Sequence, residues 1–305
     1  MILWLGLAVA AGMLLSAGIA AVYLADSFTR SRRTRVQGTP ADLGLRYEEI
    51  QFLTADRLTL RGWFLDAPNA RATVVLVHDL GANRAERARS LLYLQRDYVR
   101  RGLAVFAFDL RGHGESGGKR DTLGRDERLD VQAAVAYVRR RTGSTPIVLH
   151  GFGFGAALAL EAVAHGTEVA GIVADSPFVS MRQYMRSEYR HAPAPVFWAA
   201  SFLARRLFRA DMDAVRPIRA IERVTTPVLF IHNEGDHQVP PAHTLNLAAA
   251  SMDPRVRVWI VSDLLGHGNA FSQTPEPYLR RCTQFVDELA PARGSYSATS
   301  TQAAG

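Results

Sequence analysis

The sequence is poor in residues that form covalent or metal cross-links. Its single cysteine, Cys282, excludes an internal disulfide, so the cysteine content does not require an oxidising compartment. His232, His237 and His243 lack the spacing of metal ligands, and we expect neither a metal nor a cofactor. No internal repeat divides the 305 residues. Length and apolar content predict one globular domain of roughly 250 residues.

Charged side chains are absent from residues 2–24. As a helix rising 1.5 Å per residue, this segment would be about 35 Å long, enough to cross a hydrocarbon core of about 30 Å. A cleaved signal peptide is the alternative, because small residues near Ala25 could form a cleavage site. However, no basic residue precedes the segment, and its apolar run is longer than that of a typical signal peptide. We therefore expect a transmembrane anchor over residues 1–25.

The net charge of +7 does not indicate nucleic-acid binding, because the arginines are scattered along the chain. They cluster locally only at Arg30, Arg32, Arg33 and Arg35, within a predicted basic linker over residues 26–45. Positive charge that follows a membrane helix stays in the cytoplasm. The sequence thus predicts a single-pass protein with its globular domain in the cytoplasm, and it leaves the oligomeric state open.

From residue 46 onward, apolar strand patterns alternate with helical ones. The expected strands are 47–52, 58–64, 72–78, 103–110, 146–150, 169–175, 227–232 and 256–261. The expected helices are 88–101, 125–141, 154–164, 241–252 and 275–289. Such alternation predicts an α/β domain with a doubly wound, mostly parallel sheet over residues 46–290. A helical, Arg- and aromatic-rich cap is expected at about 178–224, and a disordered tail at 291–305.

In an open parallel sheet, the loops that leave the carboxyl ends of the strands carry the chemistry. Five of these loops stand out: His78–Arg84, Asp109–Ser116, His150–Ala157, His232–Asp236 and Gly266–Ala270. Taken in this order, they resemble the α/β-hydrolase superfamily, particularly its esterase and serine-aminopeptidase-like branch. The shared pattern is a glycine-rich elbow, then an acid, then a histidine.

The resemblance implies a role for several residues. Asp236 would be the triad acid, and His267 would be the general base. The backbone N–H groups of Leu80 and Phe154 would form the oxyanion hole. Asp236 could instead be an ordinary turn residue, and His267 an exposed loop residue. His78 and His113 are expected only to shape their loops.

The nucleophile itself is missing. The family's elbow reads Gly-x-Ser-x-Gly, whereas this chain has Gly153 at the serine position. Glycine has no atom that can attack a carbonyl, but it tolerates the strained backbone of an elbow. Gly153→Ser should therefore restore activity if the rest of the site is intact. If Gly153→Ser showed no hydrolase activity, the oxyanion loop or the pocket would also have been lost.

The oxyanion loop departs from the family as well. Relatives usually have His-Gly where this chain has His78-Asp79. A carboxylate here would oppose the negative charge of a reaction intermediate. Alternatively, Asp79 could turn outward and cap the loop backbone.

Three functions remain open. The first is a pseudo-hydrolase that binds a small-molecule or lipid-like ligand at the membrane. The second is an active hydrolase of esters, amides or lipids that uses water activated by His267 and Asp236, or another nucleophile. The third is a dinucleotide-binding protein, because Gly151-x-Gly153-x-x-Ala156, with Asp175 about 20 residues further on, matches that fingerprint.

Overall fold

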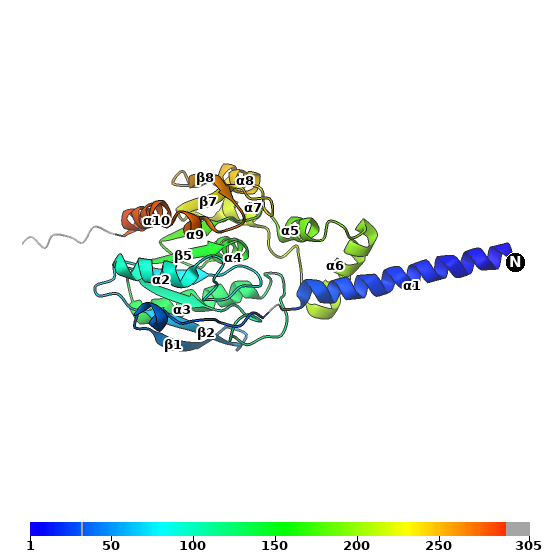
Figure 1. The fold of residues 1–305 in the computed structure, drawn as a ribbon, viewed down its shortest axis with the longest axis horizontal. Coiled ribbons are helices and arrows are strands. Elements are labelled where there is room, and N and C mark those ends of the chain that lie inside the picture. Colours follow the sequence, from blue (N-terminus) through cyan, green and yellow to red (C-terminus); the bar gives the residue numbers. More distant parts are fainter. Residues whose placement is uncertain (32, 291–305) are drawn as a thin grey trace, which may run out of the picture.

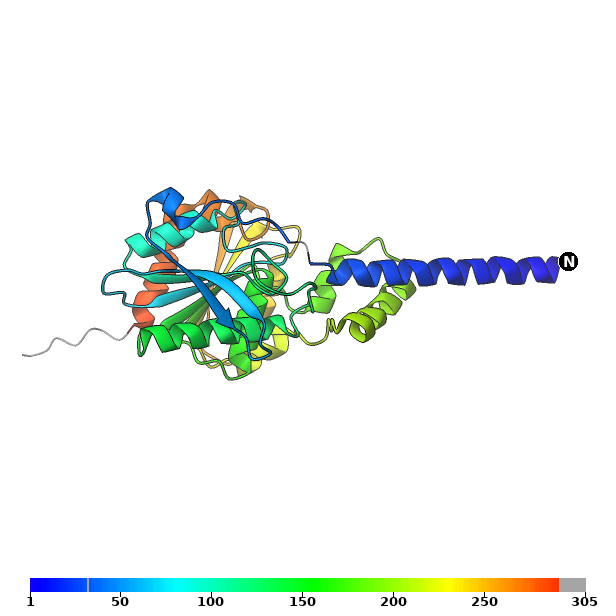
Figure 2. The same cartoon turned by 90° about the horizontal axis from the view of Figure 1, so that it is seen from below.

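The computed structural model describes residues 1–31 and 33–290. The tail at 291–305, expected to be disordered, lies outside the described residues. The chain begins with α1 (Ile2–Thr29), which projects away from the rest of the molecule (Figures 1 and 2). This helix is long and apolar enough to cross a membrane, by length and composition. It extends four residues past the expected end at residue 25, because nothing in Asp26–Thr29 breaks a helix.

A sheet of eight strands forms the centre of the globular part, in the order β1-β2-β4-β3-β5-β6-β7-β8. The strands are β1 (Glu48–Leu53), β2 (Thr59–Leu65), β3 (Thr73–Val77), β4 (Ala104–Phe108), β5 (Ile147–Phe152), β6 (Gly171–Asp175), β7 (Val228–Gly235) and β8 (Arg257–Leu265). The first two form an antiparallel hairpin at one edge, and the other strands run parallel. This is the doubly wound sheet of the α/β-hydrolase fold, as the sequence predicts.

Helices cover both faces of the sheet. On one face lie α3 (Glu127–Thr142), α4 (Phe154–Ala164) and α8 (Ala242–Ala250). On the other face lie α2 (Leu91–Arg100) and α10 (Pro275–Leu289), with the short α9 (Ala270–Gln273) beside them. The strands that they cover are buried at nearly every position, which explains their continuous apolar, β-branched sequences.

The expected cap follows β6. It contains α5 (Met181–Glu188), α6 (Ala194–Phe208), α7 (Pro217–Ala220) and the 3-10 turn η2 (Ile221–Arg223). Apolar residues of α5 and α6 pack into the same core cluster as the end of α1. Both views show α6 lying beside the half of α1 that is nearer the domain (Figures 1 and 2).

Several other boundaries differ from expectation: α2 begins at Leu91 instead of residue 88, and β7 continues to Gly235 instead of ending at residue 232. The 3-10 turn η1 (Pro40–Leu43) lies inside the predicted linker, where Thr39 and Asp42 form a capping box. In addition, β8 continues to Leu265, past the expected end at residue 261. A register shift between Asn233 and Gly235 lets the pairing of β8 with β7 continue to this point.

The parallel register aligns the chemistry-bearing loops. Val77 at the end of β3 pairs with Phe108 of β4 and with Gly151 of β5. The loops that follow these three strands therefore start at one edge of the sheet. The backbones of the loops after β3 and β5 approach each other closely. A Cβ added at Gly155 would lie 2.6 Å from the carbonyl oxygen of His78.

This approach predicts that Gly155→Ala lowers the free energy of unfolding by about 3 kcal/mol, because backbone atoms must move to make room. Denaturant titration measures the loss. Gly166→Ala is the control: its site has open space but a positive φ, so it should cost only about 1 kcal/mol. Equal losses for the two variants would show that the packing at Gly155 is not close.

Candidate functional site

Asp236 and His267 lie together. Asp236 follows β7 and His267 follows β8, and His267 Nδ1 lies 2.7 Å from Asp236 Oδ2. The other carboxylate oxygen of Asp236 accepts backbone N–H groups from Gln238 and Val239, each at 2.9 Å. His232 Nε2 lies 3.2 Å from Asp236 Oδ2. The loop thus fixes the acid and presents it to the histidine, which is the geometry of a catalytic acid–base pair.

Gly153 forms the sharp turn between β5 and α4. Its φ is +49°, a backbone conformation that residues other than glycine rarely adopt. Its N–H donates to the carbonyl of Asp175 at 2.8 Å, which ties the turn to the neighbouring strand β6. Helix α4 begins at the next residue, Phe154, so the N–H groups of its first turn have no acceptor within the helix.

The Asp79 carboxylate occupies the place expected for an oxyanion. Its Oδ1 accepts the backbone N–H groups of Leu80 and Phe154, both at 2.7 Å. These are the two donors that the sequence predicts for the oxyanion hole. The outward orientation of Asp79 is therefore wrong, because the side chain is buried and points into the site; from there its carboxylate also caps the loop backbone at Leu80.

The same carboxylate fills the space where a nucleophilic side chain would begin. A Cβ at Gly153 would lie 2.6 Å from Asp79 Cγ and 2.6 Å from Oδ2. Such distances are shorter than van der Waals contact allows. With Asp79 in this position, residue 153 has room only for glycine.

Arg89 completes the arrangement. Its Nη2 lies 2.7 Å from Asp79 Oδ2, and its Nη1 lies 2.6 Å from Glu86 Oε1. His267 Nε2 lies 3.4 Å from Asp79 Oδ2. The side chains of Arg89, Asp79 and His267 are each less than a tenth exposed. Two cations therefore compensate the buried Asp79 carboxylate, in addition to the two backbone donors.

Sequence reasoning missed Arg89. It falls just before α2, within the segment 88–101 that is expected to be helical. Nothing in its spacing distinguishes it from the other arginines there. The only sequence signal for such a cation was Asp79 itself, because a buried carboxylate needs a cation nearby.

These contacts shift the pKa values of both His267 and Asp79. Burial disfavours charge on His267, but the contacts with Asp236 and Asp79 outweigh it and raise the pKa of His267 to about 9. Burial also opposes charge on Asp79, yet Arg89 and His267 hold the pKa of Asp79 well below its usual range. At neutral pH the site therefore contains an imidazolium next to a carboxylate.

Other polar residues shape the loops. His78 Nε2 accepts the N–H of Leu110, and His113 Nε2 accepts the N–H of Gly81, both at 3.0 Å. The predicted loop-shaping role of these two histidines is thus confirmed. Ser176 Oγ accepts the N–H of Gly268 at 3.1 Å, which positions the loop that carries His267.

Asp175 does not fit the role of a ribose-binding residue. It is fully buried, and its carboxylate accepts hydrogen bonds from Ser176 Oγ at 2.9 Å and Tyr278 Oη at 2.8 Å. The N-terminus of α4, where a pyrophosphate would bind, already holds the Asp79 carboxylate. Neither the ribose contact nor the pyrophosphate contact of a bound dinucleotide is therefore available, which argues against the dinucleotide interpretation.

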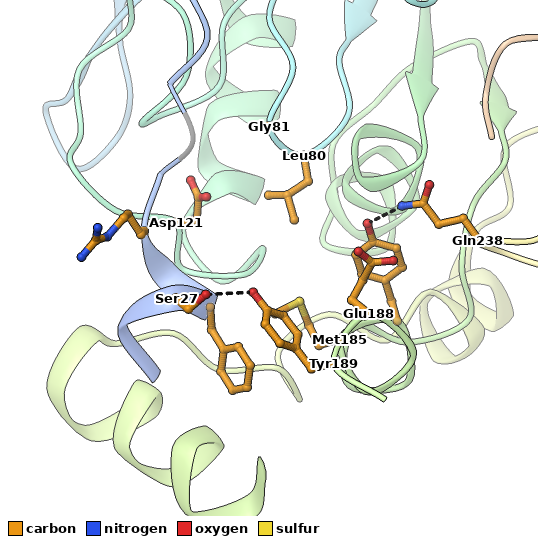
Figure 3. A pocket seen from close by; sticks show the side chains of 11 residues that line it. Ser27, Leu80, Gly81, Asp121, Met185, Glu188, Tyr189 and Gln238 are labelled. Atoms are coloured by element: carbon orange, nitrogen blue, oxygen red, sulfur yellow. Dashed lines mark hydrogen bonds between the residues drawn. The ribbon is translucent and has the colours of Figure 1, made fainter. Parts of the chain in front are cut away.

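A cavity of about 170 Å³ adjoins the oxyanion loop. Leu80 and Gly81 form one side of it, the end of α1 a second, and Tyr184, Glu188 and Tyr189 of the cap a third (Figure 3). Tyr189 is hydrogen-bonded to Ser27 at 3.2 Å, and Gln238 donates to Tyr184 at 3.1 Å. Helix α1 thus forms part of the wall of the cavity beside the site.

Comparison with known proteins supports the same fold. The sequence profile described as "Serine aminopeptidase, S33" matches residues 68–288. The chain belongs to this family. It is 30% identical over 255 residues to the protein YfhR of Salmonella typhi, with 77% of each chain covered. It is 24% identical to the membrane protein YNL320W of Saccharomyces cerevisiae, over 72% of this chain and 73% of that protein.

A solved structure, the esterase Pf2001 of Pyrococcus furiosus, superposes with a TM-score of 0.72. It shares 24% identity and covers 86% of this chain and 98% of its own, which is a likeness of fold. As a member of the serine aminopeptidase family, the protein is an esterase- and peptidase-like α/β hydrolase.

The raised pKa of His267 predicts how stability depends on pH. Because the folded pKa of about 9 exceeds the ordinary value of 6.5, the charged histidine stabilises the fold. This contribution is fully present below about pH 6.5 and is lost as the pH rises through 9. Denaturant midpoints measured from pH 6 to 10 should therefore fall more steeply for the natural protein than for His267→Gln. The exposed His165 supplies a control, His165→Gln, which should follow the natural protein; identical slopes for all three would contradict the assignment.

Proposed function

We propose that this protein is a membrane-anchored, non-hydrolytic member of its family that binds a ligand without cleaving it. One observation carries the proposal: the Asp79 carboxylate accepts both N–H groups of the oxyanion hole. An acyl-transfer intermediate needs those donors for its own negative charge. While Asp79 holds them, the site repels such an intermediate instead of stabilising it.

The absent nucleophile supports the same proposal. Loss of a triad nucleophile costs on the order of 10⁶ in turnover, or about 8 kcal/mol of barrier. Glycine at position 153 leaves no side-chain oxygen or sulfur at the turn. Cys282 cannot replace it, because it is buried under the opposite face of the sheet, in α10.

The protonation of His267 argues against water activation. A general base must be neutral before it can accept a proton from water. Here the Asp79 carboxylate lies 3.4 Å from His267 Nε2, the nitrogen that would act, and a pKa of about 9 keeps the ring charged at neutral pH. Hydrolysis through water is the alternative function, favoured by the intact pair of Asp236 and His267, and it requires Asp79 to leave the site.

The ligand is expected to bind close to the membrane. The cavity beside Leu80 is bordered by Ser27 and Phe28 at the end of α1, so its position follows that of the anchor. Aromatic rings line it together with charged groups of both signs, Asp121, Glu188 and Arg30, which suits a small amphiphilic or lipid-like molecule. We propose single-pass anchoring through residues 2–24 with the domain in the cytoplasm, and the membrane protein YNL320W among its relatives supports the anchoring.

Restoring hydrolysis should require two substitutions. Gly153→Ser alone should stay inactive, because its Cβ would clash with Asp79. Gly153→Ser combined with Asp79→Gly frees both the space and the oxyanion donors. Glu86 still pairs with Arg89 in the double variant. We expect the double variant to react with a fluorophosphonate and to hydrolyse p-nitrophenyl acetate on the order of 10³-fold faster than the natural protein.

The matched control adds His267→Ala to the double variant and should abolish the gained activity. Asp79→Gly alone tests the water mechanism, since it removes the blocking carboxylate without supplying a nucleophile. Steady ester hydrolysis by the natural protein that disappears in His267→Ala would overturn the proposal and establish the alternative.

A further inference from the structure

Helix α6 of the cap has two different faces. Phe197, Ala200 and Ala204 are buried against the protein. On the outer face, Trp198 is 55% exposed and Phe202 is 59% exposed. Large apolar side chains at this density on the outside of a helix indicate contact with something other than water.

The buried face of α6 packs on the anchor helix. The rings of Phe197 and Phe28 lie 5.4 Å apart. Further along α6, Leu203 lines an apolar groove together with α1 residues from Leu14 to Asp26. Figures 1 and 2 show α6 alongside the domain-proximal half of α1, outside the globular part.

The length of the anchor then fixes the depth of α6. A hydrocarbon core of about 30 Å takes up roughly 20 helical residues. The uncharged segment runs only from residue 2 to residue 25, so a spanning α1 has few residues to spare. Its first charge, Asp26, pairs with Arg30 at 2.5 Å and with Arg120 at 2.7 Å, which marks the polar boundary. The α1 residues beside Leu203 therefore include residues at membrane depth.

The charges around α6 suit a lipid surface. Arg205, Arg206 and Arg209 lie at its C-terminal end, and the Arg206 guanidinium is 5.3 Å from the Phe202 ring. The Arg182 guanidinium is 4.8 Å from the Trp198 ring. Aromatic rings flanked by arginines are typical of the boundary between acyl chains and headgroups, where arginine also attracts anionic lipids.

We infer that α6 is an interfacial membrane helix, with Trp198 and Phe202 inserted at the boundary between headgroups and acyl chains of the leaflet that the domain faces. The occupant of this face is anionic lipid. The cap then lies between the bilayer and the domain. The cavity beside Leu80 lies just below the headgroups. This inference concerns only the seating of the cap and holds whether or not the site is catalytic.

The depth of α6 can be measured on the full chain. A cysteine at Phe202→Cys is labelled with a nitrobenzoxadiazole fluorophore, while the natural Cys282 is buried and the unmodified protein reports its background. The protein is reconstituted into phosphatidylcholine–phosphatidylglycerol vesicles. The matched control is Tyr93→Cys, which is 48% exposed on α2, away from α1 in both views (Figures 1 and 2).

We expect lipid carrying a doxyl group near the top of its acyl chain to quench the label at 202 several-fold more than the label at 93. Aqueous iodide should show the reverse order. Trp198→Cys should behave like Phe202→Cys and serves as the second site if one variant folds poorly. In vesicles of phosphatidylcholine alone, the difference should shrink.

Three results would overturn the inference. Equal iodide quenching at positions 202 and 93 would place α6 in water. Protection of position 202 from both quenchers would mean that a second copy of the chain covers this face. Quenching that does not depend on phosphatidylglycerol would remove the role given to anionic lipid and its arginine partners.

Discussion

The N–H groups of Leu80 and Phe154 both donate to one oxygen of Asp79, and the function that we propose depends on these two hydrogen bonds. In a hydrolase, these donors stay available for the charge that develops on a substrate. Here a permanent carboxylate uses them. The machinery that would stabilise a reaction intermediate instead stabilises a side chain of the protein itself.

This carboxylate makes neighbouring residues interdependent. A buried carboxylate is costly unless it is paired and hydrogen-bonded, and Asp79 has Arg89, His267 and the N-terminus of α4 as partners. Glycine at position 153 is required sterically while Asp79 is in place. We therefore propose that the absent nucleophile and the filled oxyanion hole are two parts of one arrangement, and we expect that reversing either alone leaves the site unable to react.

Much of the fold could be predicted from the sequence, because alternating apolar strands and helices impose a parallel sheet whose loops meet at one edge. The proximity of Asp236 and His267 follows from their chain order in the family. Arg89 could not be predicted, since its partner is set by how the loop after β3 folds back. The orientation of Asp79 was open for the same reason: a local turn and a contact across to α4 compete, and only the packed structure brings both donors to one oxygen. The packing of α6 on α1 is likewise a long-range contact without a local pattern.

The seating of Asp79 is tested most directly by the amide protons of Leu80 and Phe154 in nuclear magnetic resonance spectra of the isotope-labelled protein. Charge-assisted hydrogen bonds are short and strong, so both protons should resonate far downfield and move upfield together in Asp79→Gly. Ordinary shifts in the natural protein, unchanged by the substitution, would show that the Asp79 carboxylate is not in the oxyanion hole.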